Sequence, residues 1–165
     1  FGLPTNYKPL KSGLPCRFIQ KIGLKFAKEG DVVDAKRMLN KWKVLIPKAP
    51  IAGQTDLSNP IRFYHEKNTI ISKPGECCTE SWIVAGNFDS KYEAESFKSY
   101  LFTKIVRFLI LQTVISQDVN RKNFAFVPHL DNYDQVFSDK ILKKKWKISE
   151  EEWNYIDSKI LETGK

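Results

Sequence analysis

The sequence predicts an α+β fold in which a small mixed or antiparallel sheet packs against a long amphipathic helix, with a further helix at the C-terminus. Strand-like segments come before and between the helical ones at irregular spacing, which favours a mixed α+β domain over a regular βαβ repeat. The chain has 165 residues, of which 42% are hydrophobic, and this is enough to build one core. We therefore expect a single domain covering residues 1–165.

The first half of the chain is expected to supply most of the strands. Residues 17–27 alternate weakly around a glycine and predict two short strands or a hairpin. Residues 31–40 have a loose apolar side and predict a short helix. The β-rich run at 42–46 ends at Pro47, which cannot donate to a strand ladder. A polar loop from residue 48 to residue 59 follows.

Three more strand-like runs lie farther along the chain. Ile70 and Ile71 predict the end of one strand. Residues 81–87 form the clearest strand pattern, and their continuous apolar centre predicts burial on both faces of a sheet. A last short strand is expected at 124–127, where Pro128 ends it.

Two helix starts carry the same capping signal. In each, a serine and a glutamate three residues later satisfy backbone amides that the first helical turn leaves unpaired. Ser90 and Glu93 open a segment whose apolar residues recur at spacings of three and four as far as Phe108, which predicts one long amphipathic helix. Ser149 and Glu152 predict the start of the C-terminal helix.

The positive charge of the chain is concentrated at its N-terminus. The formal net charge is +8, and residues 1–50 hold eleven Lys or Arg against three acidic residues, whereas the remaining residues hold equal numbers of each sign. Such an asymmetry raises the local concentration of anions and favours a polyanionic partner, although many basic surfaces bind nothing in particular. Nucleic acid is the partner that this charge distribution favours.

The cysteine and apolar patterns limit the cellular setting. Three cysteines, two of them adjacent at Cys77 and Cys78, form no disulfide framework, and with two histidines they match no usual metal spacing. We expect them to pack as small apolar side chains in a protein of the reducing cytoplasm, with no metal bound. No run of about 20 apolar residues is present, so we expect no membrane span.

The sequence carries no convincing catalytic motif. A metal-dependent nuclease needs carboxylate ligands near an Asp-x-Lys or Glu-x-Lys unit on a strand. The Asp-x-Lys triplets begin at Asp34, Asp89 and Asp157, and none lies convincingly on a strand with a preceding acidic partner. The glycine-bearing cofactor turn of methyltransferases, and the acidic or Asn residue followed by Pro-Pro and an aromatic, are missing too. We therefore expect this chain not to be catalytic.

Long stretches of the chain resemble a known enzyme group. The matching segments are KWKVLIPKAPIAG at 41–53, KPGECCTESWIVAGNFDSKYEAESFKSYLFTKIVRFLI at 73–110, and FAFVPHLDNYDQVFSDKILKKKWKISEEEWNYI at 124–156. They resemble the C-terminal part of bacterial type II restriction-modification proteins that carry an adenine methyltransferase, sometimes with an endonuclease, in the same polypeptide. The opening FGLPTNY also resembles the segment that introduces this region, while residues 10–41 are only loosely similar.

The order of the elements resembles target-recognition domains of type I specificity subunits as well. In those domains a Gly-bearing strand leads into a long helix that ends near a Gln, and a strand that closes on Pro follows. The counterparts here are Gly86, the helix from Ser90, Gln117, and the Val127-Pro128 pair.

The resemblance implies a domain that selects a DNA sequence for the enzyme of which it is a fragment, an expectation that fits a chain beginning at Phe1. The implied partners are double-stranded DNA and the methyltransferase or endonuclease domains of the same chain. The implied cofactors belong to those upstream domains: S-adenosylmethionine, and Mg²⁺ where the parent enzyme also cleaves DNA. No cofactor is expected in this fragment.

Base recognition requires side chains with forked or two-sided hydrogen bonding, chiefly Arg for guanine and Gln or Asn for adenine, while Lys contacts phosphates. Suitable side chains on the expected loops are Lys48, Gln54, Thr55, Arg62, Thr79, Glu80, Gln117, Asn120, Arg121 and Lys122. The run from 117 to 122 is the strongest candidate, because several such groups share one loop.

Other basic side chains allow two interpretations. Lys104 and Arg107 lie beside the apolar stripe and either reach phosphate or brace the fold; bracing is favoured. Residues 143–145 with Trp146 form either a nucleic-acid patch or a solvated basic turn.

Two alternatives to DNA recognition stay open. A catalytic fragment of a restriction endonuclease would cleave DNA in a metal-dependent way. A module that docks onto the methyltransferase would present an exposed apolar patch larger than a few hundred Å².

Overall fold

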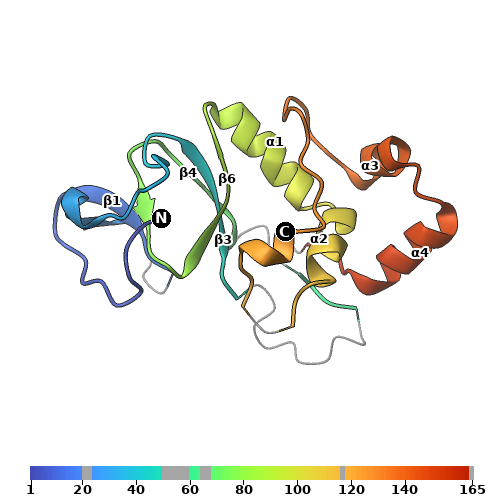
Figure 1. Ribbon diagram of the computed structural model, residues 1–165, viewed down its shortest axis with the longest axis horizontal. Helices are drawn as coiled ribbons and strands as arrows, with labels where there is room; N and C mark the ends of the chain where they lie inside the picture. The colour runs from blue at the N-terminus through green and yellow to red at the C-terminus, as the bar shows by residue number, and fades with distance from the viewer. Residues whose placement is uncertain (20–23, 50–59, 64–67, 116–117, 164–165) are drawn as a thin grey trace.

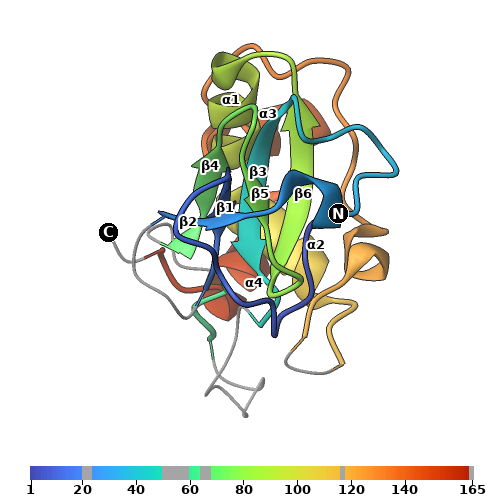
Figure 2. The same ribbon diagram turned by 90° about the vertical axis from the view of Figure 1, so that its left-hand side faces the viewer.

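The computed structural model describes residues 1–19, 24–49, 60–63, 68–115 and 118–163 (Figure 1). The described part contains two three-stranded sheets and four α-helices, so the expectation of an α+β fold is confirmed. In Figures 1 and 2 the small first sheet lies on one side of the second sheet, and the helices lie on the other.

The first sheet has the order β2-β1-β5. Strand β1 (Leu14–Arg17) pairs antiparallel with β2 (Leu24–Ala27) and parallel with β5 (Cys77–Cys78). The two strands expected within residues 17–27 are confirmed only in part, because β2 lies there whereas β1 ends at Arg17. Its three cysteines, Cys16 included, are free and fully buried, as expected of small apolar side chains.

The prediction of a helix at residues 31–40 is wrong. A 3-10 turn, η1 (Glu29–Asp31), precedes this stretch, which otherwise forms turns and a bridge. The carboxylate of Asp34 accepts hydrogen bonds from the backbone nitrogens of Met38 and Leu39, at 2.7 and 2.8 Å. A side chain that captures nearby amides in this way competes with helical hydrogen bonds.

The second sheet is antiparallel and has the order β4-β3-β6. Its strands are β3 (Trp42–Pro47), β4 (Ile70–Ser72) and β6 (Trp82–Phe88), close to the expected positions. The expectation that residues 81–87 are buried on both faces is wrong, because β6 is an edge strand and most of its side chains are half-buried. The central strand β3 is the buried one.

The single long helix expected after Ser90 is in fact two helices, α1 (Lys91–Leu101) and α2 (Lys104–Leu111). The Ser90–Glu93 capping box is present at the start of α1. Thr103 caps α2, because its hydroxyl accepts a hydrogen bond from the backbone nitrogen of Val106 at 3.2 Å.

The C-terminal part holds the remaining helices: a 3-10 turn η3 (Arg121–Phe124), α3 (Asp139–Trp146) and α4 (Glu150–Lys159). The Ser149–Glu152 capping box is confirmed at the start of α4. The prediction of a strand at 124–127 is wrong, since the end of η3 and a turn occupy these residues. The interpretation of residues 143–145 as a turn is also wrong, because they belong to α3.

The main core fills the space between the second sheet and the helices. Val44 and Ile46 of β3 meet Phe97, Tyr100 and other side chains of the helices there. Alternate residues of β3 face the first sheet, where Leu45 packs with Cys78 and Trp82. Within the described residues, no helix is long and apolar enough to pass through a membrane.

Candidate nucleic-acid interface

A groove of about 370 Å³ follows the outer edge of β6. Its floor includes the stretch from Ile83 to Asn87, with Phe97, Tyr100 and Tyr133 behind it. Lys36 and Met38 line it as well, together with residues of η3 and of the chain after it. The lining residues from that last part of the chain are Arg121, Phe124, Val127, Pro128 and His129.

Backbone hydrogen bonds attach residues 118–122, the described part of the predicted loop, to the end of the second sheet. The carbonyl of Lys48 accepts from the nitrogen of Val119 at 2.7 Å, while the nitrogen of Lys48 donates to Ser81 at 3.0 Å. The ammonium group of Lys48 also lies 3.5 Å from a carboxylate oxygen of Asp118. The loop is therefore held beside the first residues of β6.

Two asparagines fix the shape of η3. The backbone nitrogen of Asn120 donates to the side-chain oxygen of Asn123 at 2.8 Å, and the side-chain oxygen of Asn120 accepts from the nitrogen of Lys122 at 2.9 Å. Asn123, which is 5% exposed, also donates to the carbonyl of Thr113 at 2.7 Å. This network turns the exposed side chains of Arg121 and Lys122 away from the core.

The basic N-terminal region contributes Lys36 to the groove. The turn that Asp34 organises presents Lys36 to the groove, and the next residue, Arg37, adopts a positive φ of 52°. The net charge of residues 1–50 does not show which of its basic side chains lie near the predicted loop. Only the folded chain shows that Lys36 lines the same groove as Arg121.

The predicted site residues are only partly brought together. Lys48, Asn120, Arg121 and Lys122 share the region just described, and Arg121 alone of them lines the groove. The remaining candidates lie elsewhere or outside the described residues. Gln54, Thr55 and Gln117 fall outside the described residues; Arg62 is exposed beside the Ile61–Ile160 bridge; Thr79 is buried and Glu80 exposed at the turn before β6.

Three groove residues were missed by the sequence analysis: Lys36, Asn87 and His129. Lys36 closes the Asp-x-Lys triplet at Asp34, which was weighed only as a nuclease motif, and Asn87 ends the apolar strand run at 81–87. No pattern in the sequence marks any of the three as a binding residue.

Arg107 braces the fold, which is the interpretation that the sequence favours over a phosphate contact. Its side chain is 1% exposed and donates to the carbonyls of Phe102, Phe63 and Leu161, at 3.1, 3.3 and 2.8 Å. Burial lowers its pKa to about 10, so the guanidinium stays charged at neutral pH. Lys104 is also nearly buried and pairs with Asp157 and Glu162, at 2.6 and 3.0 Å.

The carboxylates of the Asp-x-Lys triplets have structural partners. Asp34 holds its turn, Asp89 pairs with Lys41, and Asp157 pairs with Lys104. Among the described residues, no group of three or more His, Cys, Asp or Glu side chains is arranged to hold a metal ion.

Comparison with known proteins gave no match to a family model, to a curated protein or to a solved structure.

Proposed function

We propose that this chain is the DNA target-recognition domain of a bacterial restriction-modification enzyme, and that the groove along β6 is where it reads the sequence. One observation carries the proposal. Arg121, the best candidate for base reading, and Lys36, from the strongly basic N-terminal region, line the same groove.

The groove has the chemistry that DNA recognition needs. Arginine presents a fork of donors that matches the two acceptors of guanine in the major groove, and lysine neutralises phosphate without reading sequence. Asn87 and His129 add further hydrogen-bonding groups to the same surface. The asparagine network of η3 fixes the backbone that carries Arg121 before DNA arrives, which lowers the entropic cost of binding.

The proposal also assigns the chemical reactions to other domains of the enzyme. Methyl transfer, and cleavage where it occurs, belong to upstream domains of the same polypeptide that use S-adenosylmethionine and Mg²⁺. The setting is the bacterial cytoplasm, where the DNA lies.

Selection from a random-sequence duplex library across a salt series tests the proposal. Enrichment of one short motif, with affinity that falls steeply as salt rises, is the expected result. Salt-sensitive binding without enrichment would contradict sequence recognition by this chain. Absence of binding to any duplex would contradict DNA recognition altogether.

A second candidate function, docking onto the methyltransferase, is favoured by an apolar hollow of about 810 Å³ between α2 and α4. Phe108, Leu109, Trp146 and Tyr155 line it, and the Tyr155 side chain is 58% exposed. Substituting Leu109 and Tyr155 with serine should weaken association with the upstream domains while leaving motif selection by this chain unchanged. Unchanged association would remove this candidate.

A further inference from the structure

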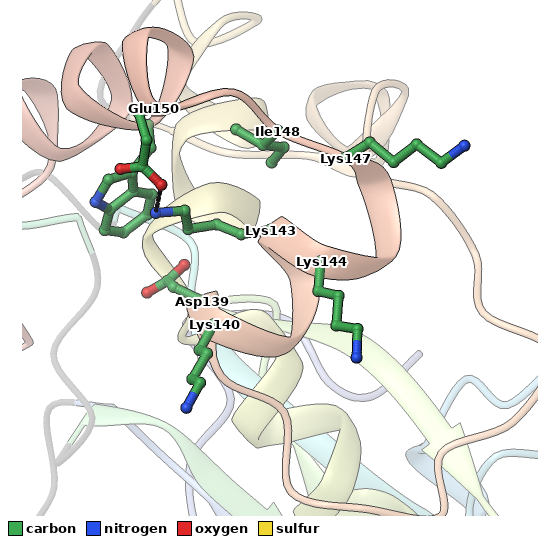
Figure 3. Close-up of a pocket in the computed structure, with 8 residues that line it drawn as sticks. Asp139, Lys140, Lys143, Lys144, Lys147, Ile148 and Glu150 are labelled. Atoms are coloured by element: carbon green, nitrogen blue, oxygen red, sulfur yellow. Dashed lines mark hydrogen bonds and ion pairs between the residues drawn. The ribbon is translucent and has the colours of Figure 1, made fainter.

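Four lysines form a stripe on one side of α3. Lys140, Lys143, Lys144 and Lys147 are spaced by three, four and seven residues, which places them on one helical face. They line a hollow of about 570 Å³ together with Ile148 and Trp153 (Figure 3). We call these four residues the α3 lysine stripe.

Lys147, the residue that follows α3, also lines the hollow. Lys147 adopts a left-handed conformation, with φ 54° and ψ 39°, and its backbone nitrogen donates to the carbonyl of Lys143. This cap ends the helix and turns the chain toward α4, while the side chain of Lys147 still faces the hollow.

One lysine of the stripe, Lys143, already interacts with two side chains of the protein itself. Lys143 donates to Glu150 at 3.1 Å and lies over the ring of Trp153, 4.8 Å from its centroid. Figure 3 shows it directed toward Glu150, whereas the other three lysines extend away from that carboxylate.

The other three lysines keep their charge available to a ligand. Lys140, Lys144 and Lys147 are exposed and form no ion pair with any residue that the structure describes. Asp139 also lines the hollow, but its carboxylate accepts hydrogen bonds from two backbone nitrogens of α2 and, among the described residues, forms no ion pair with these lysines. With four lysines against Asp139 and Glu150, the lining of the hollow carries a net positive charge.

We propose that the α3 lysine stripe binds the phosphate backbone of the DNA duplex beside the recognised sequence. This inference rests on the proposed function. Lysine is a compact cation on a flexible stem, suited to phosphates and unsuited to reading bases. Figure 1 shows α3 at the end of the molecule opposite the first sheet and separated from β6 by α1 and α2, so its contact falls on flanking DNA.

A structural role for these lysines makes a different prediction. Cations in the last turn of a helix stabilise it through the helix dipole. Lys145 serves that role equally, being in the same turn, but it falls on the other side of the helix and is not among the residues that line the hollow. Lys145 is therefore a matched control, with the same charge on the same helix.

The test compares the triple variant Lys140→Gln/Lys144→Gln/Lys147→Gln with Lys145→Gln in the full 165-residue chain. Affinity for the selected duplex and for a random duplex is measured by anisotropy across a salt series. Each lost phosphate contact lowers the slope of log affinity against log salt by about 0.9, so the triple variant should lose about 2.7. Its affinity should fall by about tenfold or more at moderate salt, equally on both duplexes.

The Lys145→Gln variant should keep the slope of the unsubstituted chain, and both variants should select the same motif. A triple variant with an unchanged slope overturns the stripe while motif selection by the unsubstituted chain upholds the proposed function. A reduced slope in a chain that selects no motif supports the stripe and overturns base reading. Absence of DNA binding by the unsubstituted chain overturns both.

Discussion

The carboxylate of Asp139 accepts a hydrogen bond from the backbone nitrogen of Ile105 at 3.0 Å, and a second one from Lys104 at 3.1 Å. Asp139, the first residue of α3, thereby pairs with two amides at the start of α2. Thr103, the cap residue of α2, leaves these two amides unpaired. A side chain far along the chain therefore helps to set where α2 begins.

Replacement of Asp139 with alanine should destabilise the protein by about 1 to 3 kcal/mol, because two amides lose their acceptor in a partly buried position. Urea unfolding measures the loss. Ser138→Ala, which removes a weaker cap at 3.4 Å on the same helix, is the matched control and should cost less. Equal losses would show that Asp139 has no special role at α2.

The titration of Asp139 should also make the free energy of unfolding depend on pH. Burial raises its pKa above the usual 3.8, although its two amide partners and Arg107 act in the opposite direction. The folded state therefore holds this proton to higher pH than the unfolded state does, and stability contributed by the protonated form is lost as pH rises from about 3.8 through the folded pKa. In Asp139→Asn this pH-dependent loss should disappear, and a difference between the two proteins that stays constant across this window would refute the assignment.

Substitution of Arg107 should lower the free energy of unfolding more than substitution at most other positions. Its guanidinium serves carbonyls from three separate segments, and alanine would leave them buried without a donor. We expect Arg107→Ala to cost about 2 to 4 kcal/mol in the free energy of unfolding. Lys98→Ala, on the half-exposed side of α1, should change stability by less than about 0.5 kcal/mol. A comparable loss in both variants would argue against the bracing role.

Gly86 occupies a place on β6 where no side chain fits. A Cβ atom there would come within 2.8 Å of the Phe88 ring and 3.1 Å of the Phe97 ring. These rings cannot easily move, because both also pack against Tyr133, with centroids 5.5 and 5.2 Å away. We expect Gly86→Ala to destabilise the protein by about 1 to 3 kcal/mol, measured as a lower urea midpoint.

Gly30 is the matched control for this substitution. A Cβ atom at Gly30 meets nothing within 4 Å, and its backbone is not in the left-handed region. Gly30→Ala should leave the urea midpoint nearly unchanged. If Gly86→Ala were as stable as Gly30→Ala, the aromatic cluster would have room to rearrange.

The sequence was most informative where the determining contacts are local. Both predicted capping boxes join residues three apart, and the strands of the second sheet follow from short apolar runs. The break between α1 and α2 was missed because the apolar periodicity continues across Thr103, while the supporting carboxylate comes from Asp139. Periodicity records which face is buried and not whether the helix axis is continuous.

The errors at residues 31–40 and 124–127 have a related cause. In both places the backbone finds local partners: Asp34 captures amides that the expected helix would have used. At 124–127 the nitrogens of Ala125 and Val127 donate to the carbonyls of Lys122 and Phe124, at 3.1 and 3.0 Å, in place of a neighbouring strand. The candidate site was predictable only as a loop that contains Arg121. Lys36, Asn87 and His129, which line the groove with Arg121, meet there through tertiary packing, which no local pattern encodes.

Asn123 should matter for recognition although it is buried and cannot touch DNA. Replacing it with alanine removes the acceptor for Asn120 and the donor to Thr113, so η3 should loosen. We expect a loss of about 1 to 2 kcal/mol in stability and weaker binding of the selected duplex. The exposed Asn132 provides a control, and Asn132→Ala should leave both quantities unchanged. Full selectivity in Asn123→Ala would show that recognition does not need a fixed η3.

Arg121 gives the most direct test of base reading, because charge and hydrogen-bond geometry can be varied separately. Arg121→Lys keeps the charge and removes the fork of donors, whereas Arg121→Ala removes both. If Arg121 contacts a guanine edge, both variants should lose about 1 to 3 kcal/mol on the selected duplex and relax selection at one base pair. Only Arg121→Ala should also lose affinity for random DNA. An Arg121→Lys variant that keeps full selectivity would reduce Arg121 to a phosphate contact, because a point charge cannot distinguish guanine from the other bases.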